Sequence, residues 1–100
     1  MKQIEAIIQQ LKLHEVRNAL DEMGIEDFME SAVKCHGHQN ERTMSFRGAK
    51  FVANIVEKVK LEIIAADESV DKIIEAIGSI AKTGRKEDCR IAIRPYLEVT

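Results

Sequence analysis

Apolar and polar residues alternate along several short segments, and this period of two is typical of strands with one buried face. Residues 2–9, 56–65 and 89–94 show the pattern clearly, and Pro95 closes the last of them. Residues 28–34 show it more weakly, but their apolar members and their place after a predicted helix favour a strand there too. The alternating apolar positions are Ile4, Ala6 and Ile8, then Val59, Leu61 and Ile63, then Ile91 and Ile93.

Two other segments carry apolar residues at helical spacing. The first spans residues 13–23, and Gly24 follows it as the expected C-terminal stop. The second spans residues 70–81, with Asp67 as its expected N-cap and Gly84 as its expected end. The apolar stripes are Leu13, Val16, Leu20 and Met23 in the first helix, and Val70, Ile73, Ile74, Ile77 and Ala81 in the second.

The predicted order is therefore strand, helix, strand, long loop, strand, helix, strand. Two βαβ units in succession indicate an α+β fold of the ferredoxin-like kind, a βαββαβ sandwich with an antiparallel sheet and two helices on one face. Residues 1–100 are enough for one such domain. Ile7 and Ile64 fall on the otherwise polar second face of the sheet, so we expect another subunit to cover it.

The segment between the two units is the most unusual part of the chain. Residues 37–50 show neither a sustained period of two nor a helical period, so no buried core accounts for them. A loop of this length in a small domain is usually functional. We therefore expect the two βαβ units to form a rigid base that presents this loop to a ligand or a partner.

The composition of the chain argues against several classes of function. The net charge of −2 argues against a nucleic-acid-binding protein, which normally has a basic excess. No apolar run approaches the roughly 20 residues of a membrane span, and the chain does not open on a signal-peptide pattern, so we expect a cytoplasmic protein that is not itself embedded in a membrane. In that reducing compartment Cys35 and Cys89 are expected to be free thiols. No nucleophile with a partner base can be identified, so we do not expect an enzyme.

Three stretches carry recognisable motifs, namely MKQIEAIIQQLKLHEVRNALDEMGI at the start, RGAKF at residues 47–51 and KVKLEIIAADESVDKIIEAI at residues 58–77. These stretches resemble the PII signal-transduction proteins, which regulate nitrogen metabolism. The opening MKQIEAIIQQLKLHEVRNALDEMGI follows the family pattern M-K-x-I-E-A-I-I-x-P-x-K-L almost position for position. RGAKF at residues 47–51 stands where the family has R-G-A-E-Y. KVKLEIIAADESVDKIIEAI at residues 58–77 resembles the family's K-V-K-I-E-I-V-V-x-D, and a Thr-Gly pair follows at residues 83–84. The resemblance covers nearly the whole chain.

This resemblance implies a homotrimer that binds a small effector in the clefts between its subunits. The effector would be an adenine nucleotide: ATP, ADP or AMP. A second ligand could bind with it, either 2-oxoglutarate together with Mg²⁺, another small carboxylate, or bicarbonate. Residues 37–54 are similar to the family's T-loop, which docks onto a transporter or a metabolic enzyme. Residues 83–90 are similar to its B-loop, which cradles phosphates.

The same resemblance implies individual binding residues. Gln39 and Lys58 match the positions that contact Mg²⁺ and 2-oxoglutarate in the family, and without the resemblance Lys58 would be interpreted as a solvated strand residue. The implied effector site consists of Ile7, Gly37, His38, Gln39, Lys58, Glu62, Ile64, Thr83, Gly84, Arg85, Asp88 and Arg90. The implied docking residues of the T-loop are Met44, Phe46, Arg47 and Phe51.

The chain departs from the family pattern at the phosphate loop. The family has T-G-K/R-x-G-D-G-K/R, whereas this chain reads TGRKEDCR, with Glu87 and Cys89 in place of two glycines. Glycine takes positive φ without strain and lets backbone N–H groups approach a phosphate. The chain also ends at Thr100, before an arginine-containing segment of the family. We therefore expect weaker nucleotide binding, or a preference for ADP or AMP. Phe51 replaces the tyrosine that some relatives uridylylate, so that switch is absent.

Three alternatives remain open at this stage. Cys35, His36 and His38 are candidate ligands of a soft metal ion in a metal-responsive protein, although residues that fill space at the base of the loop are the more ordinary interpretation. Cys35 and Cys89 are candidates for a disulfide between subunits, or are simply two half-buried thiols. The third alternative is a trimeric docking adaptor that has lost effector binding.

Overall fold

The computed structural model describes residues 1–36, 42–46, 49–53 and 55–100, and for residues 42–46 and 49–53 it describes the backbone. These residues form strands, two α-helices and three single turns of 3₁₀-helix, η1 to η3. The strands are β1 (Lys2–Ile8), β2 (Phe28–His36), β3 (Arg42–Phe46), β4 (Ala49–Ala53), β5 (Ile55–Ala65) and β6 (Cys89–Pro95). The helical elements are η1 (Gln10–Lys12), α1 (Leu13–Glu22), η2 (Asp67–Ser69), α2 (Val70–Ala81) and η3 (Lys86–Asp88).

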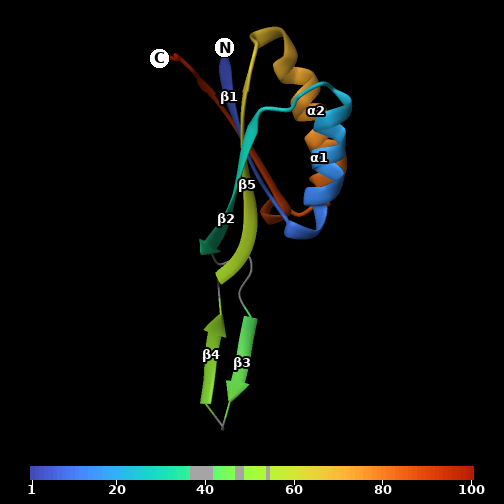
Figure 1. The fold of residues 1–100 in the computed structure, drawn as a ribbon. Coiled ribbons are helices and arrows are strands. Elements are labelled where there is room, and N and C mark those ends of the chain that lie inside the picture. The colour runs from blue at the N-terminus through green and yellow to red at the C-terminus, as the bar shows by residue number, and fades with distance from the viewer. Residues whose placement is uncertain (37–41, 47–48, 54) are drawn as a thin grey trace.

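The main sheet has the strand order β2-β5-β1-β6, and every neighbouring pair is antiparallel (Figure 1). The register pairs Ile4 of β1 with Ile63 of β5 on one side and with Ile93 of β6 on the other. Since cross-strand partners share a face, the alternating apolar positions of three strands line up on one side of the sheet. The predicted ferredoxin-like α+β fold is confirmed.

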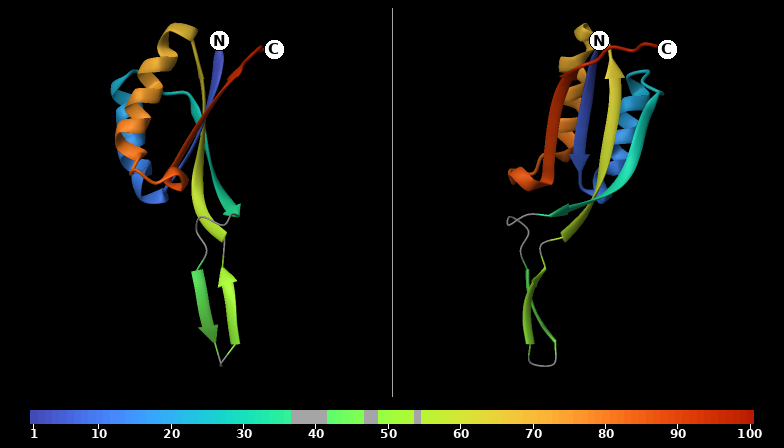
Figure 2. Two further views of the ribbon diagram at one scale, coloured as in Figure 1. Left: turned by 180° about the vertical axis from the view of Figure 1, so that it is seen from behind. Right: turned by 90° about the vertical axis from the view of Figure 1, so that its left-hand side faces the viewer.

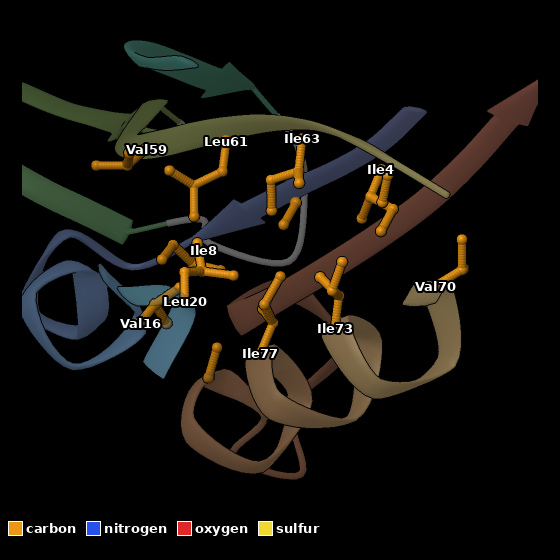
Figure 3. Close-up of a cluster of buried hydrophobic side chains, with 13 residues drawn as sticks. Ile4, Ile8, Val16, Leu20, Val59, Leu61, Ile63, Val70, Ile73 and Ile77 are labelled. Carbon is orange, nitrogen blue, oxygen red and sulfur yellow. The ribbon is translucent and has the colours of Figure 1, made fainter. Parts of the chain in front are cut away.

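Both helices cover this apolar face, and the other face carries no helix (Figure 2). The core lies between the helices and the two central strands (Figure 3). Its position confirms most of the strand faces and helix stripes expected from the sequence, but Ile93 of β6 is 47% exposed and Met23 after α1 is 37% exposed. The buried residues are Ile4, Ala6 and Ile8 of β1, Val16 and Leu20 of α1, Val59, Leu61, Ile63 and Ala65 of β5, and Val70, Ile73, Ile77 and Ala81 of α2.

The helix ends agree with the sequence at α1 and differ at α2. Gly24 follows the C-cap of α1 with a φ of 78°, and its N–H donates to the carbonyl of Asp21 at 2.9 Å. The expected N-cap Asp67 is wrong, because its carboxylate pairs with the N-terminal amino group at 3.1 Å and makes no capping hydrogen bond. The expected end at Gly84 is also wrong: α2 stops at Ala81, since Lys82 is already extended.

The long segment between β2 and β5 contains regular backbone that the sequence pattern did not predict. Strands β3 and β4 form an antiparallel ladder from Arg42↔Ala53 to Phe46↔Ala49. Figure 1 places this ribbon beyond the ends of β2 and β5.

The face of the sheet without helices is mixed in character. Ile7 and Ile64 lie on it and are partly buried, while Met29 of β2 lies on the same face and is 64 % exposed. Around them, Arg94 pairs with Glu5 at 2.7 Å. In the described part of the chain, no helix is long and apolar enough to cross a membrane.

Candidate effector site

A cleft forms where β1 leaves the sheet and β6 enters it. Ile8 and Cys89 are register partners, so the residues after β1 lie beside the loop that precedes β6. Lys58 of the neighbouring β5 faces the same end of the sheet. The cleft has a volume of about 340 Å³ and is lined by Gln9, Gln10, Leu11, Val56, Glu57, Lys58, Arg85 and Asp88.

Asp88 joins the parts of this cleft. Its side chain is buried, with 6 % of the residue exposed, and its carboxylate accepts hydrogen bonds from two directions. The Thr83 hydroxyl donates to Oδ2, and the Gln9 side-chain amide donates to Oδ1 at 3.1 Å. Thr83 Oγ1 in turn accepts the backbone N–H of Arg85 at 3.4 Å. One carboxylate therefore fixes both the end of β1 and the start of the 83–88 loop.

Lys58 is buried at the bottom of the same region. Only 4 % of it is exposed, and its ammonium group donates a hydrogen bond to the main-chain carbonyl oxygen of Glu87. The interpretation of Lys58 as a solvated strand residue is therefore wrong. A cation removed from water needs polar partners, and this one is held in place by the loop.

Glu87 also contacts the second cation of the cleft. Its Oε1 accepts hydrogen bonds from Arg85 Nε at 2.9 Å and Nη2 at 2.6 Å. The pKa of the Glu87 carboxyl is lowered, first by its own backbone N–H and then by the Arg85 guanidinium, with a further contribution from Lys58. The pKa of Arg85 is raised by the same pair. Both groups are thus charged at neutral pH.

The other implied effector residues lie farther along the sheet. Ile7 and Arg90 are register partners on β1 and β6, one position beyond Ile8 and Cys89. Glu62 accepts a hydrogen bond from Gln3 at 3.0 Å, and Ile64 follows it on the same face of β5. Because a strand rises about 3.3 Å per residue, Ile64 stands about 20 Å from Lys58 along β5. A single copy of the chain therefore does not gather all of these residues at one site.

Part of the predicted set falls outside the described residues, namely Gly37, His38, Gln39 and Arg47. Three docking residues lie on the β3–β4 ribbon, where the register makes Met44 and Phe51 direct cross-strand partners. Phe46 pairs with Ala49 at the end of the same ladder.

The candidate metal ligands Cys35 and His36 stand at the end of β2, and His38 lies outside the described residues. Within the described ranges, no group of three His, Cys, Asp or Glu side chains is placed to hold a metal ion. Cys35 and Cys89 are free and half-buried. They belong to β2 and β6, the two edges of the sheet, so they do not pair within one chain.

Cys89 fits the loop of residues 83–90 without strain. Its φ of −154° and ψ of 124° are those of ordinary extended backbone, which any residue adopts. The positive φ in this loop belongs to Gly84, at 92°. The loss of a glycine at Cys89 therefore causes no conformational problem here. Burial raises the pKa of the Cys89 thiol, and Lys82 and Lys58 partly oppose this.

Sequence reasoning missed Gln9 as a residue of this site. Nothing in its local pattern distinguishes it from Gln10. The antiparallel pairing of β1 with β6 is the signal that would have found it, because that register places the residue after Ile8 opposite the residue before Cys89.

Comparison with known proteins gives a consistent result. The family model described as "Nitrogen regulatory protein P-II" matches residues 1–99. The nitrogen regulatory protein P-II of Rhizobium meliloti (strain 1021) is 42% identical over 99 residues, which are 99% of this chain and 88% of that protein. The protein of the same name from Azospirillum brasilense is 43% identical over the same shares. That of Haemophilus influenzae (strain ATCC 51907 / DSM 11121 / KW20 / Rd) is 41% identical over 93 residues, 93% of this chain and 83% of that protein. The chain belongs to the P-II family of nitrogen regulatory proteins, which are signalling regulators rather than enzymes.

Proposed function

We propose that this P-II family regulator binds an adenine nucleotide in clefts between the subunits of a cytoplasmic homotrimer and signals the bound state to a partner protein. The single observation that supports this most is the cleft at the end of β1, where Lys58, Arg85 and the Asp88 network converge. Ammonium and guanidinium groups are suited to phosphates and carboxylates. The ligand class is therefore anionic, with ADP or AMP preferred over ATP with Mg²⁺, and a small carboxylate such as 2-oxoglutarate, or bicarbonate, as a second ligand.

Two features support a site shared between subunits. Along β5, Ile64 stands about 20 Å from Lys58 and Glu62 about 13 Å from it, so both parts of the strand contribute to one ligand only if a neighbouring copy supplies one of them. In addition, Ile7 and Ile64 lie on the helix-free face, where a second copy would bury them. A C3 arrangement uses each end of the strand once in every cleft.

The signalling element in this proposal is the segment of residues 37–54, a T-loop within a single domain of residues 1–100. An effector that contacts Gln39 and Lys58 on either side of its base would favour one arrangement of the segment through differential contacts. A transporter or a metabolic enzyme would then bind that arrangement through Met44, Phe46, Arg47 and Phe51. The B-loop of residues 83–90 would hold the phosphates.

The first experiment is calorimetric titration of the protein with ATP, ADP and AMP, each with and without Mg²⁺ and 2-oxoglutarate. We expect micromolar binding of at least one nucleotide, and loss of that binding in Lys58→Ala. The matched control is Lys34→Ala, which removes the same charge from an exposed position of β2. Binding that is equal in the parent and in Lys58→Ala would contradict the assignment of the site.

The assembly needs its own measurement. Light scattering of the eluted protein should give three times the chain mass of 11.3 kDa. A monomer at all concentrations would contradict the shared cleft, and a trimer that binds no nucleotide would contradict the effector while leaving the assembly intact.

A further inference from the structure

Glu87 contacts two cations of the cleft, the buried Lys58 and the exposed Arg85, and it uses a different atom for each. Its carboxylate oxygen Oε1 accepts two hydrogen bonds from the Arg85 guanidinium, at 2.9 and 2.6 Å. Its carbonyl oxygen accepts the hydrogen bond from the Lys58 ammonium. The Glu87 side chain is 16% exposed, whereas that of Arg85 is 62% exposed. One residue therefore occupies donors of both cations that line this cleft.

The chemistry of this contact is that of an anion bound to a cationic site. Both N–H groups of the guanidinium point at one carboxylate oxygen, which is a charge-assisted contact of the kind that an anionic ligand would also make with Arg85. The Glu87 carboxylate stays ionised at neutral pH because its pKa is lowered. A ligand must therefore displace it from Arg85 or bind beside a like charge, and the second penalty grows with the ligand's own charge.

We propose that Glu87 is an internal competitor for anionic ligands and sets the charge selectivity of the cleft. This inference rests on the proposed function for the identity of the ligand, but the competition itself concerns only the contacts of Arg85 and Glu87. Glu87 weakens the binding of polyphosphates more than the binding of AMP. It does so by masking Arg85 and by placing a negative charge beside the ligand.

The test compares Glu87→Gln with the parent in titrations with ATP, AMP and inorganic tripolyphosphate. Gln keeps the shape of the side chain and leaves the carbonyl partner of Lys58 in place. We expect the affinity for ATP and tripolyphosphate to rise about three- to tenfold, a range set by the modest strength of partly exposed ion pairs and the loss of one like charge. The gain for AMP should be smaller.

Two controls distinguish the loss of the Arg85–Glu87 contact from the loss of one negative charge in general. Glu75 is exposed on α2 and lies outside the lining of the cleft, so Glu75→Gln removes an equal charge without touching the Arg85 contact, and it should change affinity less than about twofold. If masking of Arg85 is the cause, the double variant Arg85→Ala with Glu87→Gln should lose most of the gain, as a double-mutant cycle would measure.

The outcomes also distinguish this inference from the proposed function. If the parent binds nucleotide and Glu87→Gln binds it no better, the competition is overturned while the proposed function stands. If no variant binds nucleotide but Glu87→Gln binds tripolyphosphate more tightly than the parent does, the competition stands and the proposed effector is wrong. If neither the parent nor any variant binds any of the three probes, both the competition and the proposed function are overturned.

Discussion

The side-chain amide of Gln9 donates a 3.1 Å hydrogen bond to the carboxylate of Asp88 and so joins the end of β1 to the loop before β6. The second carboxylate oxygen accepts the Thr83 hydroxyl. Both oxygens of a buried carboxylate are thus used as acceptors, and the geometry of the candidate cleft depends on them.

Asp88→Asn should destabilise the protein, because the amide offers one acceptor oxygen where the carboxylate offers two, one to the Gln9 amide and one to the Thr83 hydroxyl. Leaving a buried hydrogen-bonding group unsatisfied costs about 1–3 kcal/mol in the free energy of unfolding, measured by urea denaturation. Asp27→Asn, at an exposed position before β2, is the matched control and should change stability little. Equal stability of Asp88→Asn and the control would show that the carboxylate does not organise the loop.

Gly24→Ala should cost about 1–2 kcal/mol because a left-handed φ of 78° is unfavourable for a residue with a Cβ. No heavy atom lies within 4 Å of the position of a Cβ there, so the cost is conformational and Gly24→Asn should be milder. Gly78→Ala is the opposing control. Gly78 lies inside α2 with Lys82 Cε at an ordinary 3.6 Å, so alanine should stabilise the helix there by about 0.5–1 kcal/mol. Thermal unfolding of the three variants tests both signs.

The elements that form the core were predictable because each carries a local pattern. Ile4, Ala6 and Ile8 alternate within one strand, and Ile73 and Ile77 repeat within one helix, so the buried face of each can be identified without knowing its neighbours. The β3–β4 ladder was not predicted in this way, because residues 37–50 taken together show no sustained alternation.

The candidate site was only partly predictable, because its contacts depend on register and on turns. Lys58 and Asp88 were expected from the family resemblance, but neither the burial of Lys58 nor its bond to the Glu87 carbonyl has a sequence signal. Glu87 was singled out as a residue in place of a family glycine. Its pairing with Arg85 follows from the turn of η3, which brings residues two apart within hydrogen-bonding distance.

The ion pair between Arg17 of α1 and Glu30 of β2 should make stability depend on acid pH. The pKa of Glu30 is lowered, chiefly by hydrogen bonds from the Arg17 guanidinium at 2.9 and 2.8 Å. Between this lowered pKa and the ordinary value of 4.5, the unfolded chain binds a proton that the folded chain does not. The contribution of the pair is therefore complete above that ordinary value and is lost as pH falls through the folded pKa.

Thermal midpoints of the parent and of Glu30→Gln, followed from neutral pH down to about pH 3, test this linkage. The parent should lose more stability than the variant in the acid range, and added salt should reduce the difference because the pair is exposed. Glu26→Gln, at an exposed position just before β2, controls for the loss of one negative charge. Parallel curves for the parent and Glu30→Gln would refute the assignment.

Cys89 should react slowly with alkylating reagents in the folded protein. The thiolate is the reactive form, and burial both raises the pKa of this thiol and restricts access to it. In a Cys35→Ser background, iodoacetamide should modify Cys89 at least about threefold more slowly at pH 8 than in the chain unfolded by guanidinium. The rate in the folded protein should also rise at a more alkaline pH than in the unfolded chain.

A charge substitution separates the electrostatic cause from simple shielding. Of the two lysines that lower the pKa of Cys89, Lys82 has the larger effect, so Lys82→Ala should slow alkylation further. Lys72→Ala, on an exposed part of α2, should leave the rate unchanged. Faster alkylation in Lys82→Ala would mean that access controls the reaction, whereas a slower rate at neutral pH that recovers in alkali would show that the thiol's ionisation controls it.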